Sequence, residues 1–137
     1  MLVDSSVWID FLRGGKTAET LFLNESLDRG DPVWLAAPIL QEVLQGADSK
    51  QRFQKWDKAL GELPMIEDAD LRALTREAAA LYAACRWRAF TPRSANDCLI
   101  AAYAIRSGMP LLHRDRDFER IAAIEPNLKL LQLGSAT

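Results

Sequence analysis

The sequence predicts an α/β fold in which helices cover both faces of a parallel sheet. Short, almost continuously apolar runs alternate with longer stretches whose apolar residues recur at helical spacing. Strands that are buried on both faces have such continuous apolar runs, as in parallel sheets covered by helices. The 137 residues are enough for a substantial core. Because they contain no repeat, low-complexity tract or long linker, we expect a single domain over residues 1–137.

The first predicted elements are a strand and two helices. Met1 to Val3 is a short apolar run that predicts a buried strand. Apolar residues then recur at helical spacing as far as Gly14, which is expected to end the first helix. The apolar residues between 21 and 27 predict a second helix, closed by Gly30.

The middle of the chain predicts a second strand and two more helices. Residues 33–37 form another apolar run. Pro38 is well placed to open a helix, because the N–H that proline lacks is not needed in a first turn. This helix is expected to end near Gly46, and a fourth helix surrounds Trp56.

Two longer helices and two strands follow. A helix over about 68–86 carries apolar residues from Leu71 to Tyr82 on its inner face. Ser94 predicts the start of the next helix, because a residue able to cap is followed three residues later by an acid. The later strands, around a short helix after Asp117, are expected at residues 111–113 and 128–133.

The composition narrows the classes of function. Hydrophobic residues at 49% and charged residues at 26% are ordinary for a soluble globular protein. A net charge of -2 gives no general attraction to nucleic acid, so such binding would need local basic clusters. Two cysteines and a single histidine suggest neither a disulfide framework nor a zinc site. Without a signal peptide or an apolar run near the ~20 residues of a membrane span, we expect a cytoplasmic protein with no membrane partner.

Acidic residues follow strand ends or lie in first helical turns. Asp4 follows the first strand, and Asp115 and Asp117 follow the strand at 111–113. Glu42 lies one turn into the helix after the second strand, and Asp97 lies in the first turn of its helix. Ligands of open parallel sheets bind beyond the carboxyl ends of the strands. The fold is therefore able to bring these acids to one rim of the sheet.

Carboxylates gathered at one rim would repel each other. A pair ~4 Å apart costs about 4 kcal/mol at an effective dielectric constant near 20. Either some carboxylates take up protons or a cation neutralises them. Oxygen ligands without histidine or cysteine select Mg²⁺ or Mn²⁺. Such an ion activates water and stabilises charge on a phosphoryl oxygen, so the pattern predicts phosphodiester hydrolysis.

Each acid also has a simpler structural interpretation. Asp4 could cap the first helix, and Glu42 could merely face solvent. Asp97 could complete a capping box with the serine that opens its helix, a role that is compatible with a site. Asp115 could belong to an ordinary charged turn, with Asp117 as the cap of the short helix.

The segment RWRAFTPR, residues 86–93, interleaves arginines with aromatic residues before the helix of Asp97. Guanidinium groups hold phosphates, and aromatic rings stack on unpaired bases. A basic helix end beside two core aromatics would have the same pattern. We expect Trp87 and Phe90 to be core residues and Arg93 to contact RNA.

Basic residues also flank the last pair of acids. Arg114 and Arg116 could steer a phosphate, or either could pair with a neighbouring aspartate. His113 is interpreted as a strand-end residue and not as a catalytic base.

Four motifs occur along essentially the whole chain. They are MLVDSSVWIDFLRG at the start, Glu42 in the third helix, NDCLIAAYA at Asp97 and LLHRDRDF at Asp115. In this order and at these intervals they resemble the PIN-domain ribonucleases, and within them the VapC toxins of type II toxin–antitoxin pairs. Any one motif alone is weak, whereas the four together are specific.

The resemblance implies a PIN-like three-layer α/β/α fold with a central, mostly parallel sheet of four to five strands. It implies an endoribonuclease that uses Mg²⁺ or Mn²⁺ to activate water and cleaves structured RNA, in tRNA or rRNA. It also implies a homodimer held inactive by a VapB-like antitoxin in a heterotetramer or larger complex.

The resemblance also assigns roles to individual residues. Asp115 corresponds to the family's fourth acid, and its neighbour Asp117 binds the metal directly or through water. The last motif often carries Asn or a different spacing, so the division of labour between these two residues stays open. Ser6 matches a position that hydrogen-bonds within the site. The implied sets are catalytic Asp4, Glu42, Asp97 and Asp115; metal-binding Asp4, Asp97, Asp115 and Asp117; and RNA-binding Arg93, Arg114 and Arg116.

Two other functions compete with this one. A phosphatase of the haloacid dehalogenase type also begins with an aspartate after its first strand, but it needs a second aspartate where this chain has Ser6. The main alternative is a PIN-like module that binds RNA or protein without catalysis.

Overall fold

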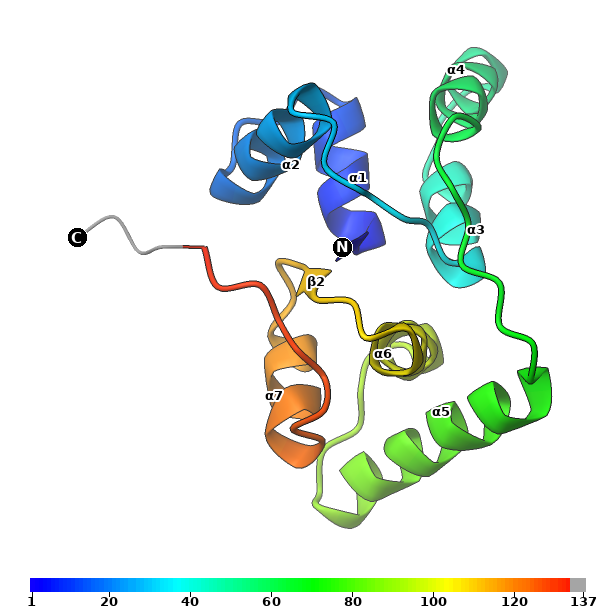
Figure 1. The fold of residues 1–137 in the computed structure, drawn as a ribbon, viewed down its shortest axis with the longest axis vertical. Helices are drawn as coiled ribbons and strands as arrows, with labels where there is room; N and C mark the ends of the chain where they lie inside the picture. Colours follow the sequence, from blue (N-terminus) through cyan, green and yellow to red (C-terminus); the bar gives the residue numbers. More distant parts are fainter. Residues whose placement is uncertain (134–137) are drawn as a thin grey trace.

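The structure is a computed structural model that describes residues 1–133. Residues 134–137 of the expected domain lie outside the described residues. Within the described part the chain forms seven helices and two short strands (Figure 1). Their order is β1 Leu2–Val3, α1 Ser5–Leu12, α2 Ala18–Asp28, α3 Ala37–Gln45, α4 Lys50–Leu60, α5 Leu71–Trp87, α6 Ala95–Ser107, β2 Leu111–Leu112 and α7 Arg116–Ile124.

The two strands form the parallel centre of the molecule. Leu2 lies opposite Leu111, and Val3 lies opposite Leu112. All four side chains are buried, as expected for strands covered on both faces. In Figure 1 the helices α1 and α2 lie on one side of β2, and α6 and α7 lie on the other. The expected α/β class with a parallel sheet is therefore confirmed.

The expected four to five strands are not confirmed within residues 1–133. The neighbouring extended segments make single parallel bridges and no continuous ladders. These bridges join Leu2 to Trp34, Leu35 to Met65, and Leu111 to Leu130. The expected strands at 33–37 and 128–133 are thus represented by only one or two paired residues each.

The helices begin where the sequence offers capping residues. Asp4 caps α1 and Ser94 caps α6, while Pro38 lies in the first turn of α3. Helix α6 contacts α3, α5 and α7, so it is packed against three other helices. No helix in the described part combines the length and the hydropathy that a membrane span requires.

Two expectations for the long helix α5 are wrong. Its buried face runs through Leu74, Ala78, Leu81 and Cys85, but Leu71 is 64% exposed and Trp87 is 82% exposed. Leu71 is the first residue of the helix, beyond the stripe that packs on the core. Trp87 follows Cys85 by two residues, which is about 200° around the helix and therefore on the opposite face. Phe90, by contrast, is buried as expected.

Candidate active site

Asp4 lies at the carboxyl end of β1, beside the end of β2. Its backbone N–H donates to the Leu112 carbonyl at 2.9 Å, which fixes Asp4 at the junction of the two strands. The Ser6 hydroxyl donates to Asp4 Oδ2 at 2.7 Å, and the Ser6 N–H donates to the same oxygen at 3.4 Å. Asp4 is thus a helix cap, as its simpler interpretation held, and its buried carboxylate also faces the other acids.

Asp97, Asp115 and Asp117 form the tightest acidic group in the described chain. One carboxylate oxygen from each lies within 4.8 Å of the others. Asp97 is in the first turn of α6, Asp115 caps α7, and Asp117 is in the first turn of α7. The starts of α6 and α7 therefore bring three carboxylates close together. Asp97 and Asp117 are buried, and Asp115 is partly buried.

The hydrogen bonds at the starts of α6 and α7 show which residues cap these two helices. Ser94 accepts from the Asn96 N–H at 3.1 Å, and the Asp97 backbone N–H donates to the Ser94 carbonyl. Asp115 Oδ1, and not Asp117, caps α7 by accepting from the Asp117 N–H at 2.9 Å. The proposed cap at Asp117 is therefore wrong by two residues, because the helix begins at Arg116.

Glu42 approaches the group from α3. The Ser5 hydroxyl donates to Glu42 Oε1 at 3.3 Å. Partial burial and the charge of Asp4 raise the pKa of Glu42, while hydrogen bonds from Ser5 and Asn96 oppose the shift. Glu42 therefore does not simply face solvent. The contributions of Ser5 and Asn96 were not foreseen, because they depend on how α1 and α6 pack against α3.

The negative charges of neighbouring acids contribute to the raised pKa values in this cluster. Burial, reinforced first by Asp4 and then by Asp115, raises the pKa of Asp97 from its ordinary 3.8 to about 7. Smaller contributions come from Glu42 and Asp117. Burial also raises the pKa of Asp4, with a further contribution from Asp115, although hydrogen bonds from Ser6 oppose the shift. The five acids predicted from scattered motifs therefore belong to one electrostatic cluster.

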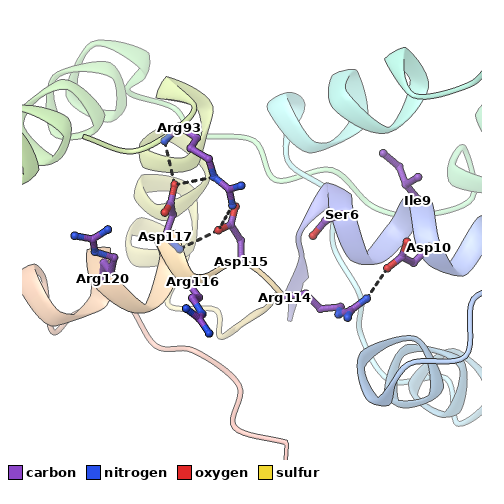
Figure 2. A pocket seen from close by; sticks show the side chains of 9 residues that line it. All are labelled: Ser6, Ile9, Asp10, Arg93, Arg114, Asp115, Arg116, Asp117 and Arg120. Atoms are coloured by element: carbon purple, nitrogen blue, oxygen red, sulfur yellow. Dashed lines mark hydrogen bonds and ion pairs between the residues drawn. The ribbon is translucent and has the colours of Figure 1, made fainter. Parts of the chain in front are cut away.

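Arg93 partly neutralises this cluster from within the chain. Its Nη2 donates to Asp115 Oδ1 at 2.7 Å, and its Nε lies 3.6 Å from Asp117 Oδ2 (Figure 2). The Arg93 backbone N–H also donates to Asp117 Oδ2 at 3.0 Å. Sequence reasoning gave Arg93 an RNA contact only. These contacts join α7 to the loop before α6, a pairing that no local pattern reveals.

An open pocket of about 920 Å³ adjoins the acids. Figure 2 shows side chains from α1, α7 and the loop of Arg93 around it. Arg114 does not pair with its neighbour Asp115, because its guanidinium reaches Asp10 at 2.9 Å and Glu19 at 3.5 Å. The lining residues are Ser6, Ile9, Asp10, Arg93, Arg114, Asp115, Arg116, Asp117 and Arg120.

His113 stabilises the turn into this site. Its Nδ1 accepts from the Asp115 backbone N–H at 3.2 Å, and its ring packs edge-on against the buried Phe118 at 5.6 Å between centroids. This position agrees with its interpretation as a strand-end residue.

The donors of the cluster fit a hard divalent cation. Asp97, Asp115 and Asp117 supply carboxylate oxygens close enough to share one ion. Oxygen donors of this kind suit Mg²⁺, Mn²⁺ or Ca²⁺. Burial, and after it the charges of the neighbouring acids, raises the pKa of Asp97, so both factors disfavour a bare carboxylate at this position. A bound cation would relieve that charge.

Comparisons with known proteins show which family this chain resembles. A family model described as the PIN domain matches residues 1–124. VapC ribonuclease Mb1587 of Mycobacterium bovis is 36% identical over 128 residues, covering 90% of this chain and 92% of that protein. Ribonuclease VapC11 of Mycobacterium tuberculosis matches with the same identity and coverage.

Solved structures give a similar result for the fold. The crystal structure of VapBC2 from Rickettsia felis, bound to a DNA fragment from its promoter, matches with a TM-score of 0.73 at 21% identity. That match covers 95% of this chain and 96% of the other. A toxin–antitoxin complex from Klebsiella pneumoniae matches with a TM-score of 0.67 at 20% identity, covering 93% of each chain.

Proposed function

The chain belongs to the PIN-domain family and is a homologue of VapC ribonucleases, and from this we propose that it is a divalent-metal-dependent endoribonuclease acting as a toxin. The observation that carries the proposal is the convergence of Asp97, Asp115 and Asp117 to within 4.8 Å. These acids lie at the starts of two consecutive helices, α6 and α7, which are separated by β2. Such a gathering of buried charge is costly unless it binds a cation.

The metal is proposed to be Mg²⁺ or Mn²⁺, held by Asp97 and Asp115, with Asp4 and Asp117 as further ligands. When bound, such an ion supplies a water of lowered pKa and positive charge beside a phosphoryl oxygen. The hydroxyl of Ser6 orients the Asp4 carboxylate through its 2.7 Å hydrogen bond. Ser5 and Asn96 hold Glu42 toward the same centre.

Arg93 is proposed to contact the RNA once a cation has taken its place beside the acids. In the structure the Arg93 side chain is 76% exposed, and its guanidinium contacts Asp115 at 2.7 Å and Asp117 at 3.6 Å. A cation bound by these aspartates would weaken both contacts and free the guanidinium to bind an RNA phosphate. The substrate is proposed to be structured RNA, in tRNA or rRNA, on the strength of the family resemblance.

A VapB-like antitoxin is the proposed partner, and a homodimer is the proposed assembly. Similar solved structures include toxin–antitoxin complexes, as their descriptions state. The contact of Arg93 with Asp115 and Asp117 supports a simple mode of inhibition, because it indicates that these acids accept a guanidinium. An antitoxin arginine inserted among these aspartates would pair with them and prevent them from binding the metal.

Cleavage of purified tRNA and rRNA with Mn²⁺ tests this proposal. We expect cleavage that EDTA abolishes and that Asp97→Asn reduces by at least about 100-fold, as for loss of a group acting on the reacting centre. Asp48→Asn, which removes a charge from the exposed loop before α4, is the matched control and should cleave normally. Undiminished cleavage by Asp97→Asn would reject this site.

The same experiment separates the non-catalytic alternative. A binding module would bind RNA without cutting it and would take up no Mn²⁺ in calorimetry. Metal uptake together with cleavage would exclude that alternative.

A further inference from the structure

Two of the four arginines in the pocket have no acidic partner among residues 1–133. Arg93 pairs with Asp115 and Asp117, and Arg114 pairs with Asp10 and Glu19. Arg116 and Arg120 line the same pocket, are exposed, and belong to none of the ion pairs of the described chain. Their charge is therefore available to a ligand.

Both of these arginines project from helix α7. Arg116 and Arg120 are four residues apart on α7, so they lie on one face of the helix, about one turn from each other. The opposite face of α7 is fixed in the core by the buried Phe118 and Ile121. Both side chains thus leave a helix that is fixed in the core and line the same pocket; in the view of Figure 2, Arg120 points up from α7 and Arg116 points down.

Arg120 is also held in position by an aromatic ring. Its guanidinium carbon lies 4.0 Å from the centroid of Phe90. Phe90 is only 7% exposed, and its backbone N–H donates to the Cys85 carbonyl at 3.0 Å at the end of α5. Arginine retains its hydrogen-bond donors when it stacks on a ring. Sequence reasoning interpreted Phe90 as a core residue, which is correct but misses this second role.

We propose that Arg116 and Arg120 form a clamp for two phosphates of a single-stranded RNA segment, which guides that strand into the acidic cluster. This proposal rests on the proposed nuclease function. A phosphate backbone suits the clamp because it repeats a negative charge along its length, and the pocket is continuous with Asp115 and Asp117. The segment from Arg86 to Arg93, which supplies Phe90, carries three arginines and no acid, although the whole chain has a net charge of -2.

Salt-dependent RNA binding tests the clamp. A fluorescent single-stranded RNA is titrated with the full chain in EDTA, between about 50 and about 200 mM salt, and anisotropy gives the affinity. Each phosphate contact contributes about 0.7 to the slope of log affinity against log salt. We expect Arg116→Gln and Arg120→Gln each to lower the slope by about 0.7, and the double variant by about 1.4.

The matched control is Arg72→Gln, which removes the same charge from an exposed site on α5 outside the pocket. It should leave the slope unchanged. Phe90→Leu keeps the charge but removes the ring, and it should weaken RNA binding less than Arg120→Gln does. Thermal melting of every variant checks that folding is retained, which we expect at the exposed positions.

Several results would overturn the clamp. One is a slope for Arg116→Gln and Arg120→Gln that equals the slope for Arg72→Gln. Another is binding of a polyglutamate peptide in place of RNA, which would assign the surface to an acidic protein. The nuclease proposal is tested separately: an intact clamp without cleavage in Mn²⁺ rejects the nuclease alone, and normal cleavage without the clamp effect rejects the clamp alone.

Discussion

The guanidinium of Arg93 lies 2.7 Å from Asp115 Oδ1, so the chain places one of its own cations against its acidic cluster. The partners come from the loop before α6 and from the cap of α7. Because Asp115 is one of the three aspartates that converge, this pairing competes with any metal bound there.

Removal of the Arg93 charge is expected to tighten metal binding. In Arg93→Gln the backbone hydrogen bond to Asp117 is retained, but the cation that competes for Asp115 is lost. An exposed ion pair is worth up to about 1 kcal/mol, so Mn²⁺ affinity should rise by up to about fivefold. Calorimetric titration with Mn²⁺ measures this change. Arg114→Gln, whose partners are Asp10 and Glu19, should show wild-type affinity, and an equal gain in both variants would contradict the argument.

The stability of the metal-free protein should fall as the pH rises from about 4 to about 7. The pKa of Asp97 is raised from 3.8 to about 7, so in this range the unfolded chain releases a proton that the folded chain keeps. The folded state is thus favoured at low pH, and this advantage is lost as the pH passes through the folded pKa. The loss from Asp97 amounts to at most about 4 kcal/mol.

Urea denaturation in EDTA at a series of pH values measures this dependence. Asp97→Asn carries no titrating group at that position, so its stability should vary much less with pH and should exceed that of the wild type at pH 8. If the variant has the same pH dependence as the wild type, another group is responsible.

A divalent cation should stabilise the fold through the same acids. A ligand present at 100 times its dissociation constant raises the free energy of unfolding by about 2.7 kcal/mol. Thermal melting with Mn²⁺ should therefore give a higher midpoint than melting in EDTA. Asp97→Asn, Asp115→Asn and Asp117→Asn should each reduce this rise in the melting midpoint, whereas Asp48→Asn should retain it. A rise that is unchanged in all three variants would place the metal elsewhere.

A glycine at position 89 is expected to stabilise the protein. Ala89 adopts a φ of 59° just after α5, a left-handed conformation that costs a residue with a Cβ about 1–2 kcal/mol. Glycine removes this cost but adds freedom to the unfolded chain, which leaves a net gain of about 0.5–1 kcal/mol for Ala89→Gly. Urea denaturation provides the measurement. Ala79→Gly, within the exposed face of α5, should instead lose about 1 kcal/mol.

Local patterns predicted the parts of the site that depend on strand ends and helix starts. Asp4 follows an apolar run, and Asp97 lies three residues after a capping serine, so their places on the elements were readable. Their convergence follows from parallel strands, which share one carboxyl edge. The four to five strands that the resemblance implies are not confirmed within residues 1–133, where the apolar runs at 33–37 and 128–133 are extended segments with one or two paired residues each.

Contacts between distant elements were not readable. Arg93 pairs with acids at the start of α7, and Arg114 pairs with acids on α1 and α2, so both sets of partners depend on tertiary packing. For Arg114, the sequence instead offered a neighbouring aspartate as the partner. Trp87 was predicted to be a core residue because its side chain is apolar. Its position on α5, about 200° around the helix axis from the buried Cys85, exposes it instead. The stacking of Arg120 on Phe90 joins two segments that no sequence pattern connects.

The hydrogen bond from the Asp4 N–H to the Leu112 carbonyl has a consequence for biosynthesis. Asp4 leaves the ribosome early, but its neighbours from α6 and α7 are translated only about a hundred residues later. For most of its synthesis a growing chain therefore has Asp4, and later Glu42, but not the three aspartates that converge. The cluster is therefore complete only after α7 has docked, and a chain that terminates before Asp115, the cap of α7, lacks two of the three converging aspartates.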